Sequence, residues 1–307
     1  MSTNKRSGLS IRARDNLAGY LFIAPSLIGF CVFTLFGVLF SIGVSFTDWS
    51  LLRDFREANF VGVQNYVNMF TNRLDWMYLK ASLRNNLYLL LVVPITIFLA
   101  AIVAAIMNKA VYGKGVARAM YFMPYVTNIV AVATVWRALY HPSKGPINML
   151  IHALGVPMEG LPGWLSSSQW ALTAIAIVLV WKDIGYDILM YSGALQGINP
   201  EFYEAADIDG ANGLVKFFRI TLPLLSPTTF MLTILGIISS LQMWSFVQVI
   251  MPQQMGTSTM TLALYIYKSA FKDYRTGYAA ALSWLLCVIV LLFTLVRWRT
   301  QKDYTVE

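Results

Sequence analysis

Six long apolar runs alternate with polar segments along the 307 residues of the chain. They lie near residues 18–46, 84–107, 117–140, 170–194, 228–251 and 278–298. Each run is long enough for an α-helix to cross the hydrocarbon core of a bilayer, which takes about 20 residues. Helices are expected rather than a barrel, because the period-two alternation of membrane strands is weak and lipid leaves no water for unpaired backbone groups. The pattern predicts an all-α integral membrane protein with six transmembrane helices.

Composition strengthens this prediction. Hydrophobic residues make up 57% of the chain and charged residues 12%, whereas soluble proteins carry about 25% charged residues. A net charge of +8 is also compatible with nucleic-acid binding. However, the basic residues are scattered at the ends of apolar runs, where they orient helices and meet anionic head groups. The charge therefore indicates a membrane and not nucleic acid.

Enzyme and metal signatures are missing from the sequence. Cys31 and Cys287 lie inside apolar runs, and His141 and His152 stand alone, so no Cys–His cluster is available to a metal. Gly113–Gly115 lacks the spacing and the hydroxyl residue of a phosphate loop, and neither G-x-S-x-G nor H-E-x-x-H occurs. We expect no catalysis, metal or cofactor in this chain. If energy from ATP is used, another chain supplies it.

The charge distribution also predicts the orientation. Residues 1–17 are polar and basic, and the run that follows is too long for a signal peptide, so we expect an uncleaved first span. With the N-terminus in the cytoplasm, twelve Lys and Arg residues fall in cytoplasmic segments and nine in external ones. The expected organisation is a cytoplasmic tail at 1–17, a six-helix membrane domain at 18–298 and a second cytoplasmic tail at 299–307.

A long polar stretch, residues 199–227, separates the fourth run from the fifth and falls on the cytoplasmic side. Asn199 can cap a helix whose first residue is the following proline, which loses nothing by its missing N–H. Gly210 can adopt a positive φ that ends this helix. Asn212 can cap a second short helix that ends near Ile220. The stretch predicts a helix–turn–helix on the membrane surface.

Polar residues inside two runs are candidates for a solute pathway. Lys182, Asp183 and Asp187 are costly if they face lipid, and the two carboxylates share one helix face. They either line a path, where carboxylates accept hydroxyl hydrogen bonds and aromatic rings stack on sugars, or contact a partner helix. Polar residues of the fifth run either line the path or hold helices together. The candidate path residues are Gly185, Tyr186, Asp187, Gln242, Trp244 and Ser245.

The stretch at 199–227 resembles the cytoplasmic signature of binding-protein-dependent ABC importer permeases. That signature is E-A-A, three residues, G, nine residues and I-x-L-P, and its spacing is matched from Glu204 to Pro223. The resemblance implies a coupling helix in which Glu204 bonds to an ATPase groove, the alanines let the helix seat and Gly210 permits the turn. The coupling residues that it implies are Glu204, Ala205, Ala206, Asp207, Gly210, Ile220, Leu222 and Pro223.

Other segments are similar to the carbohydrate-uptake branch of these permeases, specifically its first permease subunit of the maltose, glycerol-3-phosphate and multiple-sugar type. They are Ser45–Trp49, Phe60–Tyr66, Gly113–Tyr125, Trp181–Ile198 and Tyr265–Ser283. The chain departs from the family pattern at three places. Relatives often have Thr-Gly-Gly-Gly-Pro near Met251–Met255, Asn at position 187 and Ile-Pro at positions 199 and 200.

The resemblance implies a permease subunit of an ATP-driven importer for a sugar or sugar-like solute in a bacterial or archaeal cytoplasmic membrane. Its implied partners are a second permease, two ATP-binding subunits that hold Mg-ATP and an extracytoplasmic solute-binding protein. Two alternatives stay open from the residues alone. One is a secondary transporter driven by an ion gradient through Asp183 and Asp187, and the other is a membrane scaffold without a solute path.

Overall fold

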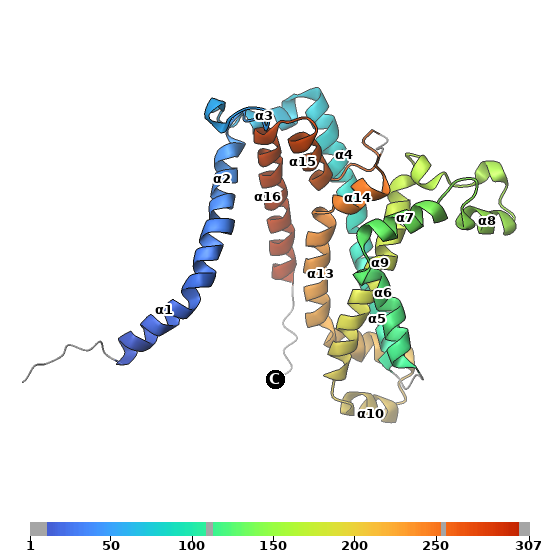
Figure 1. Cartoon of the computed structure of the whole chain (residues 1–307). Helices are drawn as coiled ribbons and strands as arrows, with labels where there is room; N and C mark the ends of the chain where they lie inside the picture. The colour runs from blue at the N-terminus through green and yellow to red at the C-terminus, as the bar shows by residue number, and fades with distance from the viewer. Residues whose placement is uncertain (1–10, 109–112, 253–255, 301–307) are drawn as a thin grey trace, which may run out of the picture.

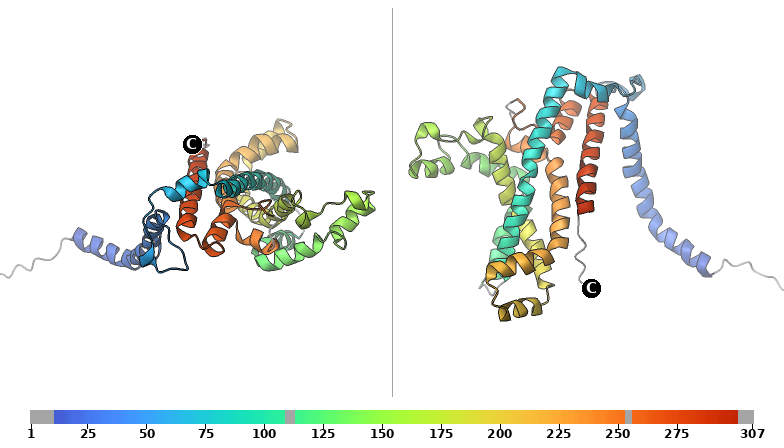
Figure 2. Two further views of the ribbon diagram at one scale, coloured as in Figure 1. Left: turned by 90° about the horizontal axis from the view of Figure 1, so that it is seen from above. Right: turned by 180° about the vertical axis from the view of Figure 1, so that it is seen from behind.

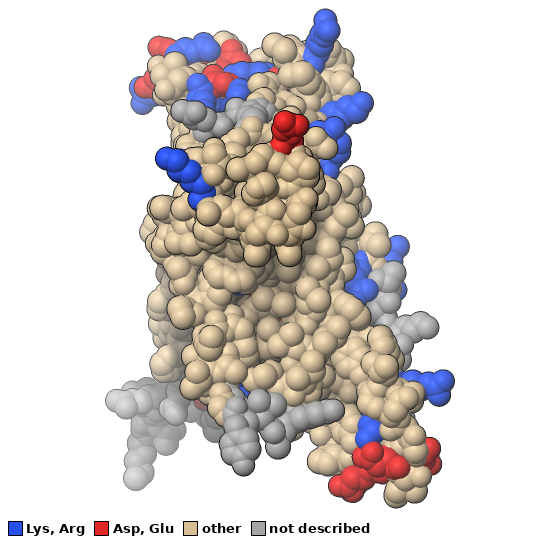
Figure 3. Space-filling model, turned by 90° about the vertical axis from the view of Figure 1, so that its right-hand side faces the viewer, with Lys and Arg blue, Asp and Glu red and all other residues tan. Residues whose placement is uncertain are grey.

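The computed structural model describes residues 11–108, 113–252 and 256–300, and over these ranges the chain is helical without a named strand. Figure 1 shows a bundle of long helices with short helices at both ends. One end, the α3 end, carries α3 (Gln64–Thr71) and α15 (Leu262–Phe271), and the opposite end carries α10 (Glu201–Ile208). Charged side chains gather mainly at these two ends in Figure 3, and the surface between them is largely uncharged. This is the surface pattern of a protein embedded in lipid.

The described helices fall into long and short ones. The long ones are α1 (Ile11–Gly29), α4 (Arg73–Leu90), α5 (Val92–Asn108), α6 (Lys114–Val126), α9 (Ala171–Gln196), α13 (Ser226–Leu241) and α16 (Thr276–Thr300). The shorter ones are α2 (Phe36–Ser45), α7 (Ile129–Leu139), α8 (Pro146–Ala153), α11 (Gly213–Lys216), α12 (Leu222–Leu224) and α14 (Ser245–Ile250).

Several of these helices can cross a membrane by length and composition. Among the described residues they are Gly19–Ser45, Arg73–Asn108 and Thr276–Arg299. Two bent pairs also qualify when each is taken as one span, which gives three to five candidates in all. α9 is not among them because it contains Lys182, Asp183 and Asp187, although its 26 residues reach about 39 Å. The chain is therefore a multi-pass helical membrane protein.

The prediction of one continuous helix over 117–140 is wrong. α6 and α7 meet there at 96°. Pro124 lacks the N–H that a continuing helix needs, and Thr127 is extended with ψ 140°. The Asn128 side chain then starts α7 by accepting a hydrogen bond from Val130 N–H at 2.8 Å. As a result α7 and α8 project sideways from the bundle (Figure 1).

The predicted helix over 228–251 is also interrupted. α13 ends at Leu241 and α14 begins at Ser245. Donors from other helices satisfy carbonyl groups at this break: Asn86 Nδ2 donates to Leu241 O at 3.3 Å, and Thr261 Oγ1 donates to Met243 O at 2.6 Å.

The helix ends differ slightly from the predicted tails. α1 already begins at Ile11, inside the predicted tail 1–17, and α16 continues to Thr300, inside the predicted tail 299–307. Four of the twelve basic residues that the orientation places in the cytoplasm, at positions 5, 6, 109 and 302, lie outside the described residues. The same holds for the last three residues, 253–255, of the divergent segment Met251–Met255.

The centre of the bundle is the pair α5 and α9, which lie side by side. Ala100, Ala101 and Ala104 are fully buried in this contact. Small side chains let two helix backbones approach closely where lipid provides no hydrophobic driving force. Tyr191 of α9 also shares a hydrogen bond of 2.8 Å with Thr229 of α13. These contacts fix α5, α9 and α13 relative to one another.

α1 and α2 stand apart from this centre in both views of Figure 2. A π-helical turn, Phe30–Leu35, joins them, and only 6% of the most apolar window of the span is buried within the chain. α2 packs against α16, and no residue of the π-helical turn is buried. Most of this helix is therefore covered by something other than the described part of the chain.

A polar cluster joins the helices at the α3 end. Asp75 of α4 is 4% exposed and accepts two hydrogen bonds from Arg275, at 2.8 and 2.9 Å. Tyr265 donates to the same carboxylate at 3.1 Å and contacts the hydroxyl group of Tyr278 at 3.1 Å. The hydrogen bonds to Asp75 raise the pKa of Arg275, so its guanidinium group stays charged. Residues about 200 positions apart are thus tied into one unit.

The start of α16 also holds the chain that follows α2. Gly277 N–H donates to Trp49 O at 3.0 Å, and Leu51 N–H donates to Thr276 Oγ1 at 3.1 Å. A Cβ atom at Gly277 would lie 2.0 Å from Thr47 O, so only glycine permits this approach.

We expect Arg275→Ala to destabilise the protein by roughly 2–3 kcal/mol, because it leaves a buried carboxylate without its cation. Asp75→Ala costs less, since Arg275 is half exposed and regains water. Thermal unfolding of the purified protein in detergent measures both. Lys268→Ala is the control, because the Lys268–Asp273 pair lies near the surface and contributes about 0–1 kcal/mol. Equal losses for Lys268→Ala and Arg275→Ala would contradict the assignment.

Candidate functional site

The first part of the polar stretch folds as predicted into a short helix and a glycine turn. Asn199 Oδ1 accepts a hydrogen bond from Glu201 N–H at 3.1 Å, and α10 begins at Glu201, one residue later than expected. Gly210 adopts φ 72°, which confirms the predicted positive φ. Ala211 N–H donates to Ala206 O at 2.9 Å, the closing bond of a glycine C-cap.

The second part is longer than predicted. Asn212 caps it by accepting a hydrogen bond from Val215 N–H at 2.9 Å. The helix then continues through a π-helical turn, Phe217–Thr221, into α12 and so ends at Leu224 instead of near Ile220. A wider turn just before Pro223 lets the helix accommodate the missing N–H.

Two side-chain contacts hold these parts together. Lys216 forms an ion pair with Asp207, and Tyr203 shares a hydrogen bond of 3.0 Å with Thr221. We call the resulting unit, residues 199–224, the coupling loop. It forms the α10 end of the molecule, where Figure 3 shows a group of acidic side chains.

The predicted coupling residues occupy different sides of this unit. Glu204, Ala205 and Gly210 are exposed, whereas Ala206 is 9% exposed and faces the interior. Asp207 is also exposed and forms an ion pair with Lys216. Ile220, Leu222 and Pro223 are half-buried in the second helix. Among the two alanines and Glu204, the first alanine and Glu204 therefore lie on the outward face of this unit.

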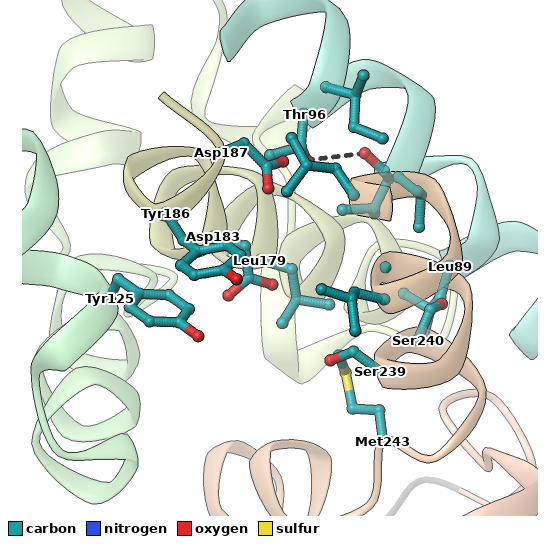
Figure 4. A pocket seen from close by; sticks show the side chains of 16 residues that line it. Leu89, Thr96, Tyr125, Leu179, Asp183, Tyr186, Asp187, Ser239, Ser240 and Met243 are labelled. Carbon is teal, nitrogen blue, oxygen red and sulfur yellow. Dashed lines mark hydrogen bonds between the residues drawn. The ribbon is translucent and has the colours of Figure 1, made fainter. Parts of the chain in front are cut away.

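A cavity of about 360 Å³ lies in the middle of the bundle. Side chains from α4, α5, α6, α9 and α13 line it (Figure 4). The wall is largely apolar, with Leu89 and Leu179 among its residues, and it includes the hydroxyl groups of Thr96, Ser239 and Ser240. Its size lies within the range of small-molecule sites.

Two carboxylates and two aromatic rings give this cavity its polar character. Asp183 and Asp187 of α9 both line it, together with Tyr125 of α6 and Tyr186 of α9. The two tyrosine rings stack with centroids 4.9 Å apart. Lys182 lies 3.6 Å from Asp183 and 5.1 Å from the centre of the Tyr125 ring.

Asp187 differs from Asp183 in having no partner. Its carboxylate makes no side-chain hydrogen bond or ion pair with any residue that the structure describes. An ionisable side chain without a partner is rare within the membrane and points to contact with a solute or with water.

Four of the predicted path residues lie away from the cavity. A Cβ atom at Gly185 would lie 2.0 Å from Tyr121 O, so this glycine serves the crossing of α6 and α9. Gln242, Trp244 and Ser245 lie at the break between α13 and α14, and the Trp244 ring stacks on Tyr267 at 4.8 Å. Only Tyr186 and Asp187 of the predicted set line the cavity.

Sequence reasoning missed Thr96 and Tyr125 as lining residues. Both lie in apolar runs, where a single hydroxyl group or ring is equally compatible with helix packing. The bend after α6, which the apolar pattern hid, determines where Tyr125 lies. Its position beside Pro124 was the one available signal, because proline breaks a helix.

Comparison with known proteins identifies the family. The model of the binding-protein-dependent transport system inner membrane component family matches residues 79–302. The chain belongs to this family. A relative in Bacillus subtilis, the probable ABC transporter permease protein YesP, is 34% identical and covers 95% of this chain and 93% of its own. The lactose transport system permease LacF of Rhizobium radiobacter is 31% identical over 99% of both chains.

Solved structures show the same fold for this binding-protein-dependent permease. A chain of a bacterial alginate ABC transporter, solved with a periplasmic protein bound to an alginate pentasaccharide, has a TM-score of 0.78. It is 22% identical and covers 95% of this chain and 96% of that one. The predicted resemblance to carbohydrate-uptake ABC permeases is confirmed by the family match and by relatives such as LacF.

Gly185→Ala tests the crossing that positions Tyr125. The added methyl group collides with the Tyr121 carbonyl oxygen, so we expect a loss of about 1–3 kcal/mol as α6 moves away from α9. Gly193→Ala on the same helix is the matched control, since nothing lies within 4 Å of its Cβ position and alanine favours a helix. Thermal unfolding in detergent compares them. Equal stability of the two variants would contradict the assignment.

Proposed function

We propose that this chain is a permease subunit of an ATP-driven importer for a sugar or sugar-like solute. The observation that carries the proposal is the coupling loop, a folded unit with the family signature exposed at one end of a membrane bundle. Family membership supports it, and so does the similarity to a permease named for lactose transport. The chain has no enzyme motif of its own, so Mg-ATP belongs to separate subunits.

The proposed topology has six spans in a bacterial or archaeal cytoplasmic membrane. They are α1 with α2, α4 with α5, α6 with α7, α9, α13 with α14, and α16. The start of α1 lies toward the same end of the bundle as α10, and α16 points toward that end (Figure 1). This arrangement supports cytoplasmic termini and a cytoplasmic coupling loop between the fourth and fifth spans.

The coupling loop is proposed to transmit force from an ATP-binding subunit. Glu204 and Ala205 face outward and form the contact. The Asp207–Lys216 ion pair and the Tyr203–Thr221 hydrogen bond make α10 move with the helix that follows it. That helix continues into α13, whose side chains line the cavity. Closing of the ATPase dimer would thus shift one wall of the cavity.

Three kinds of partner complete the importer. The apolar helix of α1 and α2 is almost unburied within this chain, which favours contact with lipid and with a second permease. Each of the two permeases is proposed to bind one ATP-binding subunit through a helix equivalent to α10, so the importer contains two ATP-binding subunits. An extracytoplasmic solute-binding protein is proposed from the family name and from the periplasmic protein in the alginate transporter structure.

The cavity suits part of a solute path. Its carboxylates accept hydroxyl hydrogen bonds, and the Tyr125–Tyr186 pair offers an aromatic face to a sugar ring. Asp183 and Asp187 are then solute contacts and not the coupling groups of an ion-driven transporter. The match to a family of binding-protein-dependent components argues against that alternative and against a scaffold without a path.

Deletion of this chain tests the proposed function. We expect the deletion strain to lose high-affinity uptake of one sugar. In the parent strain, we expect this uptake to survive an uncoupler of the proton gradient but to stop when the ATP-binding subunit is removed. A growth and uptake screen over neutral, amino and acidic sugars finds the solute. Uptake that persists without the ATPase and collapses with the uncoupler would support the ion-driven alternative.

Gly210→Leu tests the coupling loop. A leucine at φ 72° is strained by roughly 1–2 kcal/mol, so the turn should rearrange and displace α10. We expect membrane insertion to be retained while sugar uptake falls at least tenfold. Gly210→Asn should retain most uptake, because asparagine tolerates the left-handed region, and Gly213→Ala is a neutral control with open space at its Cβ. Full uptake by Gly210→Leu would exclude the proposed coupling role.

A further inference from the structure

The cavity described above carries an unbalanced charge. Its lining residues include two carboxylates, Asp183 and Asp187, and none of the lining residues that the structure describes is a lysine or an arginine. Lys182 lies nearby, but its ammonium group is 3.6 Å from Asp183, which it neutralises. The carboxylate of Asp187 remains without a counter-charge.

We infer that this half of the path selects solutes by charge: it accepts neutral or amine-bearing sugars and rejects acidic ones. The inference rests on the proposed function and names the solute class of the same site. The property that carries it is the position of an unpartnered carboxylate on the wall of a partly open, mostly apolar cavity.

The physics of an apolar cavity makes this selection strong. Two unit charges about 5 Å apart at an effective dielectric constant near 20 change an affinity on the order of a hundredfold. A sugar carboxylate beside Asp187 meets this repulsion without a free cation to offset it. A hydroxyl group instead donates a hydrogen bond to Asp187, and an ammonium group forms an ion pair with it.

The rings beside Asp187 fit the same class of solute. Tyr125 and Tyr186 stack on each other and face the cavity (Figure 4). The apolar face of a pyranose ring packs well on an aromatic surface, and its equatorial hydroxyl groups then reach a carboxylate at the edge. The amine of Lys182 lies 3.6 Å from the Asp183 carboxylate and 5.1 Å from the centre of the Tyr125 ring. Among the described residues its ion pair is with Asp183 and not with Asp187.

Three probes that differ only at one carbon test the inference. They are methyl glucoside, its 6-amino-6-deoxy analogue and methyl glucuronide, measured for binding to the full chain in lipid nanodiscs by saturation-transfer NMR. We expect the neutral and the amino sugar to bind at least tenfold more tightly than the glucuronide. The amino sugar should bind best, because it forms the ion pair with Asp187.

Charge variants separate Asp187 from general packing. In Asp187→Asn we expect the glucuronide to bind within about twofold of the glucoside and the amino sugar to lose its advantage. Asp183→Asn should also improve glucuronide binding, because it releases Lys182, and it keeps the test valid if Asp187→Asn does not fold. Asp54→Asn, in the exposed loop after α2, is the control and should leave the order of the three probes unchanged.

Three results would overturn the inference. One is equal binding of the glucoside and the glucuronide to the natural chain, and a second is an unchanged order in both Asp187→Asn and Asp183→Asn. Absence of binding by all three probes would overturn it as well, since the cavity would then not be a sugar site. The proposed function fails on a different observation, namely sugar uptake that is unaffected by deletion of the chain.

Discussion

The interior of a bilayer gives no water to a polar group, and this constraint accounts for where the chain puts its charges. Most charged side chains lie at the two ends of the bundle (Figure 3). Asp75, buried at the α3 end, is matched by two hydrogen bonds from Arg275 and one from Tyr265. Asp183 is matched by Lys182. Asp187 alone among these buried or half-buried carboxylates lacks a partner in the part of the chain described, and it lines the cavity, where a solute or water can reach it.

The same helices connect the cavity to the coupling loop. The helix from Gly213 to Leu224 leads into α13, and α13 forms one wall of the cavity. Thr229 of α13 is hydrogen-bonded to Tyr191 of α9. The helix α9 also carries the two carboxylates of the cavity, Asp183 and Asp187. A displacement of α10 is therefore not absorbed by a flexible connector. It reaches residues that would touch a solute through two helices, which meet at a bend of 68°, and through buried contacts.

The sequence was sufficient for those features that depend on local chemistry. Apolar runs located the helices, and residue types located the Asn199 and Asn212 caps and the turn at Gly210. The sequence was insufficient for features whose conformation depends on packing between distant segments. The 96° bend after α6 depends on Pro124 and Asn128 acting together, and the break after Leu241 depends on donors from Asn86 and Thr261. Gly185 looked like a path residue because it neighbours Tyr186. Its function in packing depends on the close approach of Tyr121 in α6, which the sequence does not reveal.

The central claim is that α10 is the surface on which a separate ATP-binding subunit acts. Cross-linking tests it most directly, in a background where the two native cysteines are replaced by serine. Ala205→Cys, on the exposed face of α10, should cross-link to the co-purified ATP-binding subunit, and the yield should change with Mg-ATP. Ala206→Cys, on the buried face, should not cross-link. Failure at position 205 in a complex that still hydrolyses ATP in response to solute would contradict the account.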